Sequence, residues 1–252
     1  FQEATKKRDQ IKHTNKNFAK SINSFLSRLH WRSHFIQKLE DQPSIEHTSF
    51  IPVYDQIREK DEEKLEAWIE GKTGVHFIDA CMIYLRNYGW INFRMRAMLA
   101  SFASYNLWLD WRYFAPRLAA LFTDFEPGIH YSQIQMQSGT TGINTIRMYN
   151  PYKQAMDQDP LGKFIKSQIP EVKNFPPAFF HNPPKKSLNV NLFDNEFQKE
   201  IINVKETAQY ARKKIFDIRK SQEHKILAKN VYLKHGSLSL IHISEPTRRS
   251  VI

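Results

Sequence analysis

Two fixed cations, Arg94 and Arg96, stand in a stretch of mostly apolar and small residues, which is an unusual place for charge. Small side chains around them would let another helix or a flat ligand come close. These residues are Ala97, Ala100, Ser101, Ala103 and Ser104. The arginines could therefore hold a flat ligand. The alternative is a pair of solvated arginines on a core helix, because charged residues on helices mostly face water.

The arginines lie within residues 66–112, a region whose periodicity predicts three helical segments divided by glycines. Apolar side chains recur there at the i, i+3, i+4, i+7 spacing of an amphipathic helix. One stripe consists of Ile78, Cys81, Met82 and Leu85, and a second of Met95, Met98, Leu99 and Phe102. Gly89 falls between the stripes, where a left-handed C-terminal cap would end the first helix.

Composition predicts a globular, all-α chain. The 252 residues are 41% hydrophobic and 13% aromatic, which is enough for a sizeable core. Strand-like and helix-like segments do not alternate, so we do not expect a doubly wound nucleotide-binding fold. No apolar run approaches the roughly 18 residues of a membrane helix. The one cysteine, Cys81, can form no internal disulfide and cannot hold an iron–sulfur cluster, so we expect a cytoplasmic protein without a metal site.

The net charge of +11 is concentrated at the two ends of the chain. Residues 1–40 hold 9 Lys/Arg against 3 Asp/Glu, and residues 181–252 hold 14 against 7, so the ends contribute +6 and +7. The middle contributes −2, from 14 basic and 16 acidic residues. Basic flanks around a neutral core suit a polyanion such as DNA. A solubilising surface explains the same distribution equally well.

Several motifs follow one another in a characteristic order. W-x-x-G-x-T-G at residues 68–74 precedes D-A, G-W, R-x-R, S-F and L-x-x-D-W-R. This series resembles the flavin-binding helical domain of the DNA photolyase and cryptochrome family over residues 25–173. The resemblance implies a multi-helix all-α domain that binds FAD and acts as a monomer on DNA, preferentially damaged or single-stranded.

The resemblance also concerns what precedes the domain. The family has a serine-rich, phosphate-binding turn just before residue 25, and this sequence does not. The chain also begins at Phe1 without a methionine. We therefore interpret it as a fragment that lacks the N-terminal antenna domain, and expect the fragment to bind FAD weakly or not at all.

The flavin contacts implied by the resemblance fall on eight residues. They are Phe25, Arg32, Phe93, Arg96, Asp124, Phe125, Glu126 and His130. We expect Arg96 and Asp124 to form a buried ion pair, because a buried guanidinium needs a partner to offset its desolvation. Glu126 stands where the family has a second aspartate, and His130 where it has an asparagine facing flavin N5.

A DNA face is implied in the same way. Its residues are Arg28, Trp31, Arg94, Met136, Arg147 and Gln154, with Trp31, Arg94 and His130 in catalytic roles. Trp31 would be the wall on which a flipped-out base stacks, although a tryptophan on an amphipathic helix can also belong to a core. Arg28 replaces a glutamate that contacts the lesion, and Phe93 replaces an asparagine, so the type of lesion stays open.

Electron transfer to the flavin is the third implied feature. Family members pass electrons inward along three tryptophans, and the resemblance assigns Trp68 to the outer and Trp111 to the middle position. The inner position holds Ile134, which cannot be oxidised as an indole can. We therefore expect slow flavin photoreduction, or a detour through Tyr131, Trp90 or Tyr105.

Helices are also predicted at residues 25–39, 61–69 and 108–122. Residues 127–151 are ambiguous, because alternating glutamines suit a short strand while two glycines and a proline suit an irregular segment over a ligand. A basic closing helix is expected at about residues 193–229, within a domain that spans residues 1–235. Residues 236–252 look like a translated sequencing adapter, and we exclude this tail from the domain.

Three functions are compatible with these features. The first is a lyase that uses reduced flavin and blue light to split pyrimidine photoproducts in DNA, with the cofactor carrying the chemistry. The second is a cryptochrome-like photoreceptor that binds FAD without repair. The third, a flavin-free helical scaffold, is the least compatible with Arg96 and Asp124. Repair is favoured because the cationic and stacking residues Trp31, Arg94, Arg147 and Gln154 are kept.

Overall fold

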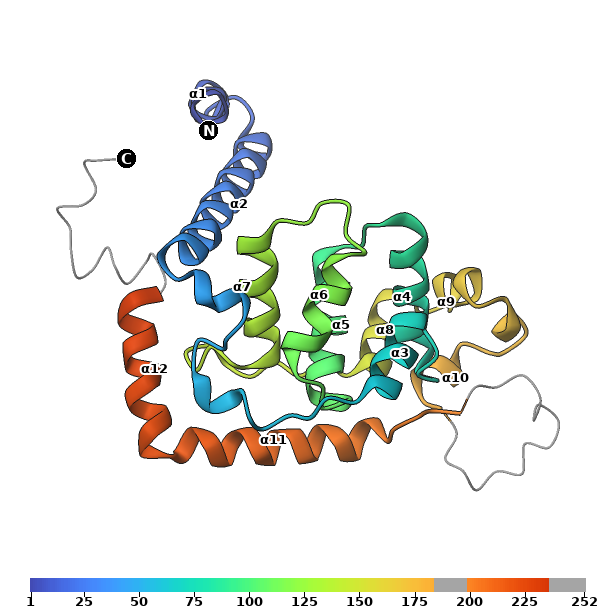
Figure 1. Ribbon diagram of the computed structural model, residues 1–252. Coiled ribbons are helices and arrows are strands. Elements are labelled where there is room, and N and C mark those ends of the chain that lie inside the picture. Colours follow the sequence, from blue (N-terminus) through green and yellow to red (C-terminus); the bar gives the residue numbers. More distant parts are fainter. Residues whose placement is uncertain (184–198, 236–252) are drawn as a thin grey trace. The chain divides into compact units, whose positions relative to one another are not determined.

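The described part of the chain is helical. The computed structural model describes residues 1–183 and 199–235. Its α-helices are α1 (Gln2–Ile11), α2 (Lys16–Asp41), α3 (Glu62–Glu70), α4 (His76–Tyr88), α5 (Phe93–Ser101), α6 (Trp111–Ala119), α7 (Pro127–Ser138), α8 (Pro151–Gln158), α9 (Lys163–Gln168), α10 (Ala178–His181), α11 (Val204–Lys220) and α12 (Gln222–His235). Shorter helical segments are η1 (Pro43–Glu46), η2 (Pro52–Tyr54), η3 (Phe102–Asn106) and η4 (Pro170–Val172). The predicted all-α class is confirmed (Figure 1).

The chain divides into two compact units. The first comprises Phe1–Glu46 and Glu126–Ser132. The second comprises the described residues of His47–Phe125 and Gln133–Ile252. Helix α7 begins in the first unit and ends in the second.

Helix α2 packs with α1 in the first unit and extends beyond the predicted residues 25–39 at both ends. It starts at Asn15, whose Oδ1 accepts a hydrogen bond from the Phe18 N–H at 3.0 Å. The first turn of α7 belongs to the same unit, and there a Cβ on Gly128 would lie 2.8 Å from the Cα of Ile36. Only glycine therefore lets α7 approach α2 this closely.

In the second unit, α3 and α4 end at glycines as the sequence predicts. Gly71 and Gly89 have φ angles of 71° and 68°, in the left-handed region that glycine adopts without strain. Asp79 holds the intervening turn, because its Oδ1 accepts from the N–H and hydroxyl of Thr73 at 2.9 and 2.6 Å. Its Oδ2 accepts from the Gly74 N–H at 2.9 Å. The T-G and D-A motifs thus have a structural role.

Helix α5 begins where Asn92 Oδ1 accepts from the Met95 N–H at 3.1 Å, and it runs directly into the π-helical segment η3. Trp108 follows with a φ of 57°, and Asp110 then accepts from the Arg112 N–H at 2.9 Å. Helix α6 therefore starts at Trp111, and the predicted helix over residues 108–122 is too long at both ends. The left-handed backbone at Trp108 and the Asp110 cap explain the later start.

Both interpretations of residues 127–138, as a strand or as an irregular segment, are wrong, because these residues form α7. Gln135 is fully buried on this helix. Its amide oxygen accepts from the Phe50 N–H at 2.7 Å, and its amide N–H donates to the Thr48 carbonyl at 3.0 Å. A helix that buries hydrogen-bonded polar residues shows no apolar stripe in its sequence. Residues 139–150 are irregular, as the second interpretation expected.

Buried Arg58 connects η3 to the end of α7. Its Nε donates to the Ser104 carbonyl at 3.0 Å and its Nη2 to the Ser138 carbonyl at 2.8 Å. Its guanidinium carbon lies 4.8 Å from the centre of the Trp108 ring. Burial lowers the pKa of Arg58, so these contacts offset part of the desolvation of a charged group.

The basic C-terminal region forms two helices where the sequence predicts one. Asn203 caps the start of α11, accepting from the Lys205 and Glu206 N–H groups at 3.1 and 3.2 Å. Ser221 is extended and its hydroxyl accepts from the His224 N–H at 3.1 Å, which ends α11 and starts α12. His224 lies 2.9 Å from the Tyr54 hydroxyl and anchors α12 to the unit.

Two further expectations concern residues at the edge of the described ranges. The predicted adapter tail, residues 236–252, and the first residues of the predicted closing helix, 193–198, lie outside them. Within the described ranges, no helix is both long enough and apolar enough to cross a bilayer.

Candidate functional site

The ion pair expected from the R-x-R motif is present in the second unit. Arg96 Nη2 lies 2.9 Å from Asp124 Oδ2. Arg96 comes from the first turn of α5, and its Nε also donates to the Ile91 carbonyl at 2.7 Å. Its guanidinium carbon lies 4.2 Å from the centre of the Phe122 ring, a cation–π distance. Three contacts therefore orient this guanidinium.

The pair is not buried, which corrects one expectation. The Arg96 side chain is 26% exposed and that of Asp124 48% exposed. Asp124 lies in the segment that connects α6 to α7 rather than on a packed helix, which leaves its carboxylate accessible. An ion pair this exposed contributes only about 0.2–1 kcal/mol to stability. Its groups remain accessible to a ligand.

Exposed aromatic side chains lie in the same part of the second unit. Phe93 is 62% exposed and stands one helical turn before Arg96 on α5. Trp90 is 50% exposed, with its ring centre 6.0 Å from the Arg96 guanidinium carbon. Phe125, next to Asp124, is 43% exposed. Exposed aromatic surface beside a charged pair can pack against a flat ligand.

Glu126 has a structural role at the start of α7. Its two carboxylate oxygens accept from the Gly128 and Ile129 N–H groups at 3.2 and 3.1 Å. Negative charge is favourable at a helix N-terminus, so this capping accounts for the residue without a ligand. His130, one turn further, is buried, and its ring meets Tyr131 edge-on with 5.2 Å between centres. Both residues belong to the first unit.

The other first-unit residues project from α2. Phe25, Arg28 and Arg32 are exposed. Trp31 is 41% exposed, which is inconsistent with a core tryptophan. Its ring contacts His34 and Phe35, at 5.6 and 5.7 Å between centres.

The residue behind Trp31 is uncharged at neutral pH. Burial, and secondarily the nearby Lys38, lower the pKa of His34 from 6.5 to about 4. Burial lowers the pKa of Lys38 to about 8. Trp31 therefore presents an indole backed by a neutral imidazole and an apolar ring, which is a suitable surface for stacking.

The remaining residues of the predicted DNA face belong to the second unit. Arg94 and Arg147 are exposed, and Met136 is half-buried. The Arg147 backbone is held to α5, since its carbonyl accepts from the Ser101 hydroxyl at 3.2 Å. Gln154 on α8 is only 9% exposed, and in the described structure its Oε1 has no hydrogen-bond partner.

Two acceptors were missed by sequence reasoning. Gln133 and Gln137 lie four residues apart on one face of α7, and each has a buried side-chain Oε1 without a partner among the described residues. A buried acceptor left unpaired costs about 1–3 kcal/mol, so such groups are candidates for binding a ligand that donates hydrogen bonds. Their i, i+4 spacing was visible in the sequence, but only a helical assignment of this segment makes it meaningful.

The tryptophan assignments are only partly compatible with the geometry. Trp68 is 0% exposed and packs edge-on against Phe114 at 5.5 Å. An outer donor must exchange electrons with a reductant in solvent, so this burial contradicts the outer position. Trp111 is 2% exposed and donates from Nε1 to the Ser49 hydroxyl at 2.9 Å, and Ile134 is 5% exposed. These two placements suit interior positions.

Comparison with known proteins identifies a family. The sequence profile described as "FAD binding domain of DNA photolyase" matches residues 25–224. Deoxyribodipyrimidine photo-lyase of Alkalihalophilus pseudofirmus is 29% identical over 170 residues, which is 66% of this chain and 36% of that protein. Cryptochrome-2 of Gallus gallus is 29% identical over 163 residues, covering 64% and 28%.

The solved structures agree with this result. An archaeal photolyase from Sulfolobus tokodaii, described with two FAD molecules, superposes with a TM-score of 0.69 at 29% identity. The match covers 83% of this chain and 47% of that one. The chain therefore spans about a third of the curated relatives' length and about half of the solved neighbour's.

Proposed function

Because the chain belongs to the DNA photolyase and cryptochrome family, whose matched domain binds FAD, we propose that it acts in light-driven repair of pyrimidine photoproducts in DNA. Its substrate is damaged DNA, with the photoproduct extruded from the helix or already in a single strand. Extrusion is least costly for damaged bases, since their stacking and pairing are already weakened.

We assign the flavin to the neighbourhood of the Arg96–Asp124 pair. The Asp124 carboxylate supports this assignment. Its described contact uses Oδ2, so Oδ1 can accept a hydrogen bond from a ligand. The exposed rings of Phe93 and Phe125 supply apolar surface for a flat ring system. The unpaired side-chain oxygens of Gln133 and Gln137 on α7 can accept hydrogen bonds from hydroxyl groups, which the ribityl chain of FAD carries.

FAD, when bound and reduced, would supply light-driven electron transfer that consumes no net electrons. The protein's part is to bind, orient and exclude water. Arg94 and Arg147, both exposed, would neutralise phosphates flanking the lesion.

The observation that carries repair is the exposure of Trp31 beside a cation. A 41% exposed indole on α2 has Arg28 three residues before it, on the same side of the helix, and both are exposed. Arg32 directly follows Trp31 and is also exposed, about 100° further around the helix. An exposed aromatic face beside a cation suits a base stacked on the ring with its phosphate paired.

A cryptochrome-like photoreceptor is the second candidate. Phe93 occupies a position where the resemblance implies an asparagine, and it is 62% exposed. An apolar ring cannot hydrogen-bond to a lesion. Arg28 in place of a glutamate exchanges a hydrogen-bond acceptor for a donor, so a lesion contact that needs an acceptor is lost. A photoreceptor requires FAD but no lesion contacts, so these departures would cost it nothing.

The test uses the protein reconstituted with reduced FAD and an ultraviolet-irradiated oligothymidylate. Blue light should restore the absorbance of the thymines, and Trp31→Ala should remove both repair and the preference for irradiated over untreated strands. Phe18→Ala, which removes another exposed aromatic ring from α2, is the matched control. Equal binding of irradiated and untreated strands, with no repair, would favour the photoreceptor.

A further inference from the structure

Helix α11 has two different faces. Its sequence carries six basic residues and two acidic ones over Val204–Lys220. Val204, Ala211 and Ile215 are buried and join the core of the second unit. Figure 1 shows α11 along the outside of that unit, and most residues on its other face are exposed. Core packing therefore accounts for the apolar residues of the buried face, but not for the basic and aromatic residues of the exposed face.

A solvent-exposed aromatic ring stands among cations on this outer face. Phe216 is 56% exposed. Arg212 and Lys213 lie four and three residues before it, and Lys220 four residues after it, so all three share its side of the helix. All three are exposed, and Lys220 Nζ lies 4.5 Å from the centre of the Phe216 ring. We call these four residues the Phe216 patch.

We propose that the Phe216 patch binds single-stranded nucleic acid independently of any lesion. Its cations would pair with successive phosphates while a base stacks on the Phe216 ring. Stacking on an aromatic side chain tolerates any base, and cations beside it supply the salt-dependent affinity. This surface is separate from the residues assigned to repair, and the proposal does not rest on photochemistry.

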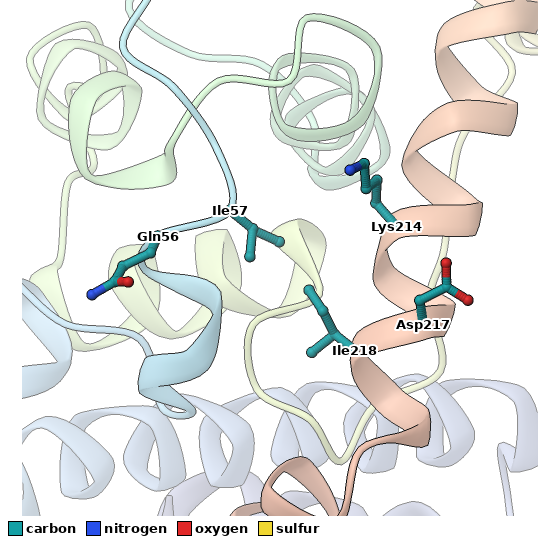
Figure 2. Close-up of a pocket in the computed structure, with 5 residues that line it drawn as sticks. All are labelled: Gln56, Ile57, Lys214, Asp217 and Ile218. Carbon is teal, nitrogen blue, oxygen red and sulfur yellow. The ribbon is translucent and has the colours of Figure 1, made fainter.

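The neighbouring pocket is a poorer candidate for the same ligand. Figure 2 shows Ile57 and Ile218 pointing toward each other at this pocket, which Gln56, Lys214 and Asp217 also line. A carboxylate at its rim repels phosphates. Asp217 Oδ1 also lies 3.8 Å from Lys220 Nζ and partly neutralises the charge of that lysine. Among the described ion pairs, none involves Arg212 or Lys213, so these two cations can pair with phosphates.

A membrane surface fits the face less well. A helix that lies on a bilayer needs a wide apolar face opposite its charged one. The apolar face of α11 is already buried in the unit, and its exposed side carries only Phe216 and Tyr210 as large apolar residues within the described structure. One ring among cations matches a base and its phosphates better than an acyl layer.

The experiment measures the binding of a fluorescein-labelled oligothymidylate to the full chain by fluorescence anisotropy, across roughly 50 to 200 mM salt. Arg212→Gln with Lys213→Gln removes two phosphate contacts, and the slope of log K against log salt should fall by roughly 1.4. Phe216→Ala should weaken binding roughly 5- to 150-fold without changing the slope.

Matched controls alter exposed groups elsewhere in the second unit. Lys163→Gln with Lys173→Gln removes the same charge, and Tyr88→Ala removes a ring that is 63% exposed. Parent-like slope and affinity in the patch variants would overturn the proposal. Tighter binding of a duplex than of the single strand by the parent would also overturn it. So would patch variants that lose binding to phosphatidylserine vesicles but keep parent-like binding to the oligothymidylate. Failure of repair with patch binding intact would instead refute only the proposed function.

Discussion

Replacing Asp124 with alanine separates ligand binding from folding. The ion pair with Arg96 spans 2.9 Å, but its side chains are 26% and 48% exposed. At that exposure the loss of the pair should lower the free energy of unfolding by only about 0.2–1 kcal/mol. Asp124→Ala should therefore fold, and its thermal transition should remain close to that of the parent.

Flavin affinity should respond more strongly. If Asp124 accepts a hydrogen bond from FAD and orients Arg96, its loss removes an interaction with a charged group worth about 1.5–3 kcal/mol. That corresponds to a dissociation constant roughly 10- to 150-fold weaker. Arg96→Lys should show a loss of similar size, because lysine keeps the charge but cannot reproduce the planar fork.

The assay is titration of FAD into each variant, followed by quenching of flavin fluorescence, with unfolding in urea measured on the same samples. Upstream residues should be added if the present chain binds too weakly to titrate. The Arg117–Glu66 pair is the matched control, since it spans 2.7 Å with side chains 43% and 41% exposed. Glu66→Ala should change stability by the same small amount and leave FAD binding intact. Parent-like affinity in both Asp124→Ala and Arg96→Lys would refute the assignment.

Three further outcomes are expected. Ile134→Trp should accelerate flavin bleaching under blue light with external reductant, because an indole can carry the electron; no gain over Ile134→Phe would show that this route is unused. Gly128→Ala should destabilise the chain by roughly 1–3 kcal/mol in urea, since the new Cβ would lie 2.8 Å from the Cα of Ile36; a neutral result would contradict the tight approach of α7 to α2. Burial lowers the pKa of His76 from 6.5 to about 4, so the unfolded chain binds more protons over that interval and stability should fall by roughly 3 kcal/mol as pH drops through it. Burial raises the pKa of Asp79 to about 6, so this carboxyl group makes stability rise as pH drops. Comparing His76→Gln with the parent isolates the contribution of the histidine. Identical stability profiles against pH for the two proteins would exclude that contribution.

Local rules were sufficient for much of the central region. Gly71 and Gly89 end helices because their positive φ angles suit only glycine well, and the apolar stripes between them predict which faces are buried. The motif order also predicted that Arg96 would meet Asp124, 28 residues away. The glycine ends and the buried faces depend on periodicity, caps and residue types, which a sequence displays directly. The Arg96–Asp124 pair was instead implied by the resemblance to the photolyase and cryptochrome family.

Other features depend on where distant segments pack. The helical state of α7 follows from hydrogen bonds between Gln135 and the backbone of residues 48 and 50, so its sequence period is uninformative. The burial of Trp68 and the exposure of Trp31 are equally tertiary, because an indole on an amphipathic helix has no local preference that distinguishes core from surface. The sequence by itself determined most of the helices and their glycine ends, since those follow from neighbours within a few turns. Only the tertiary structure decided which of these side chains remain open to a ligand, since burial depends on every segment that packs around them.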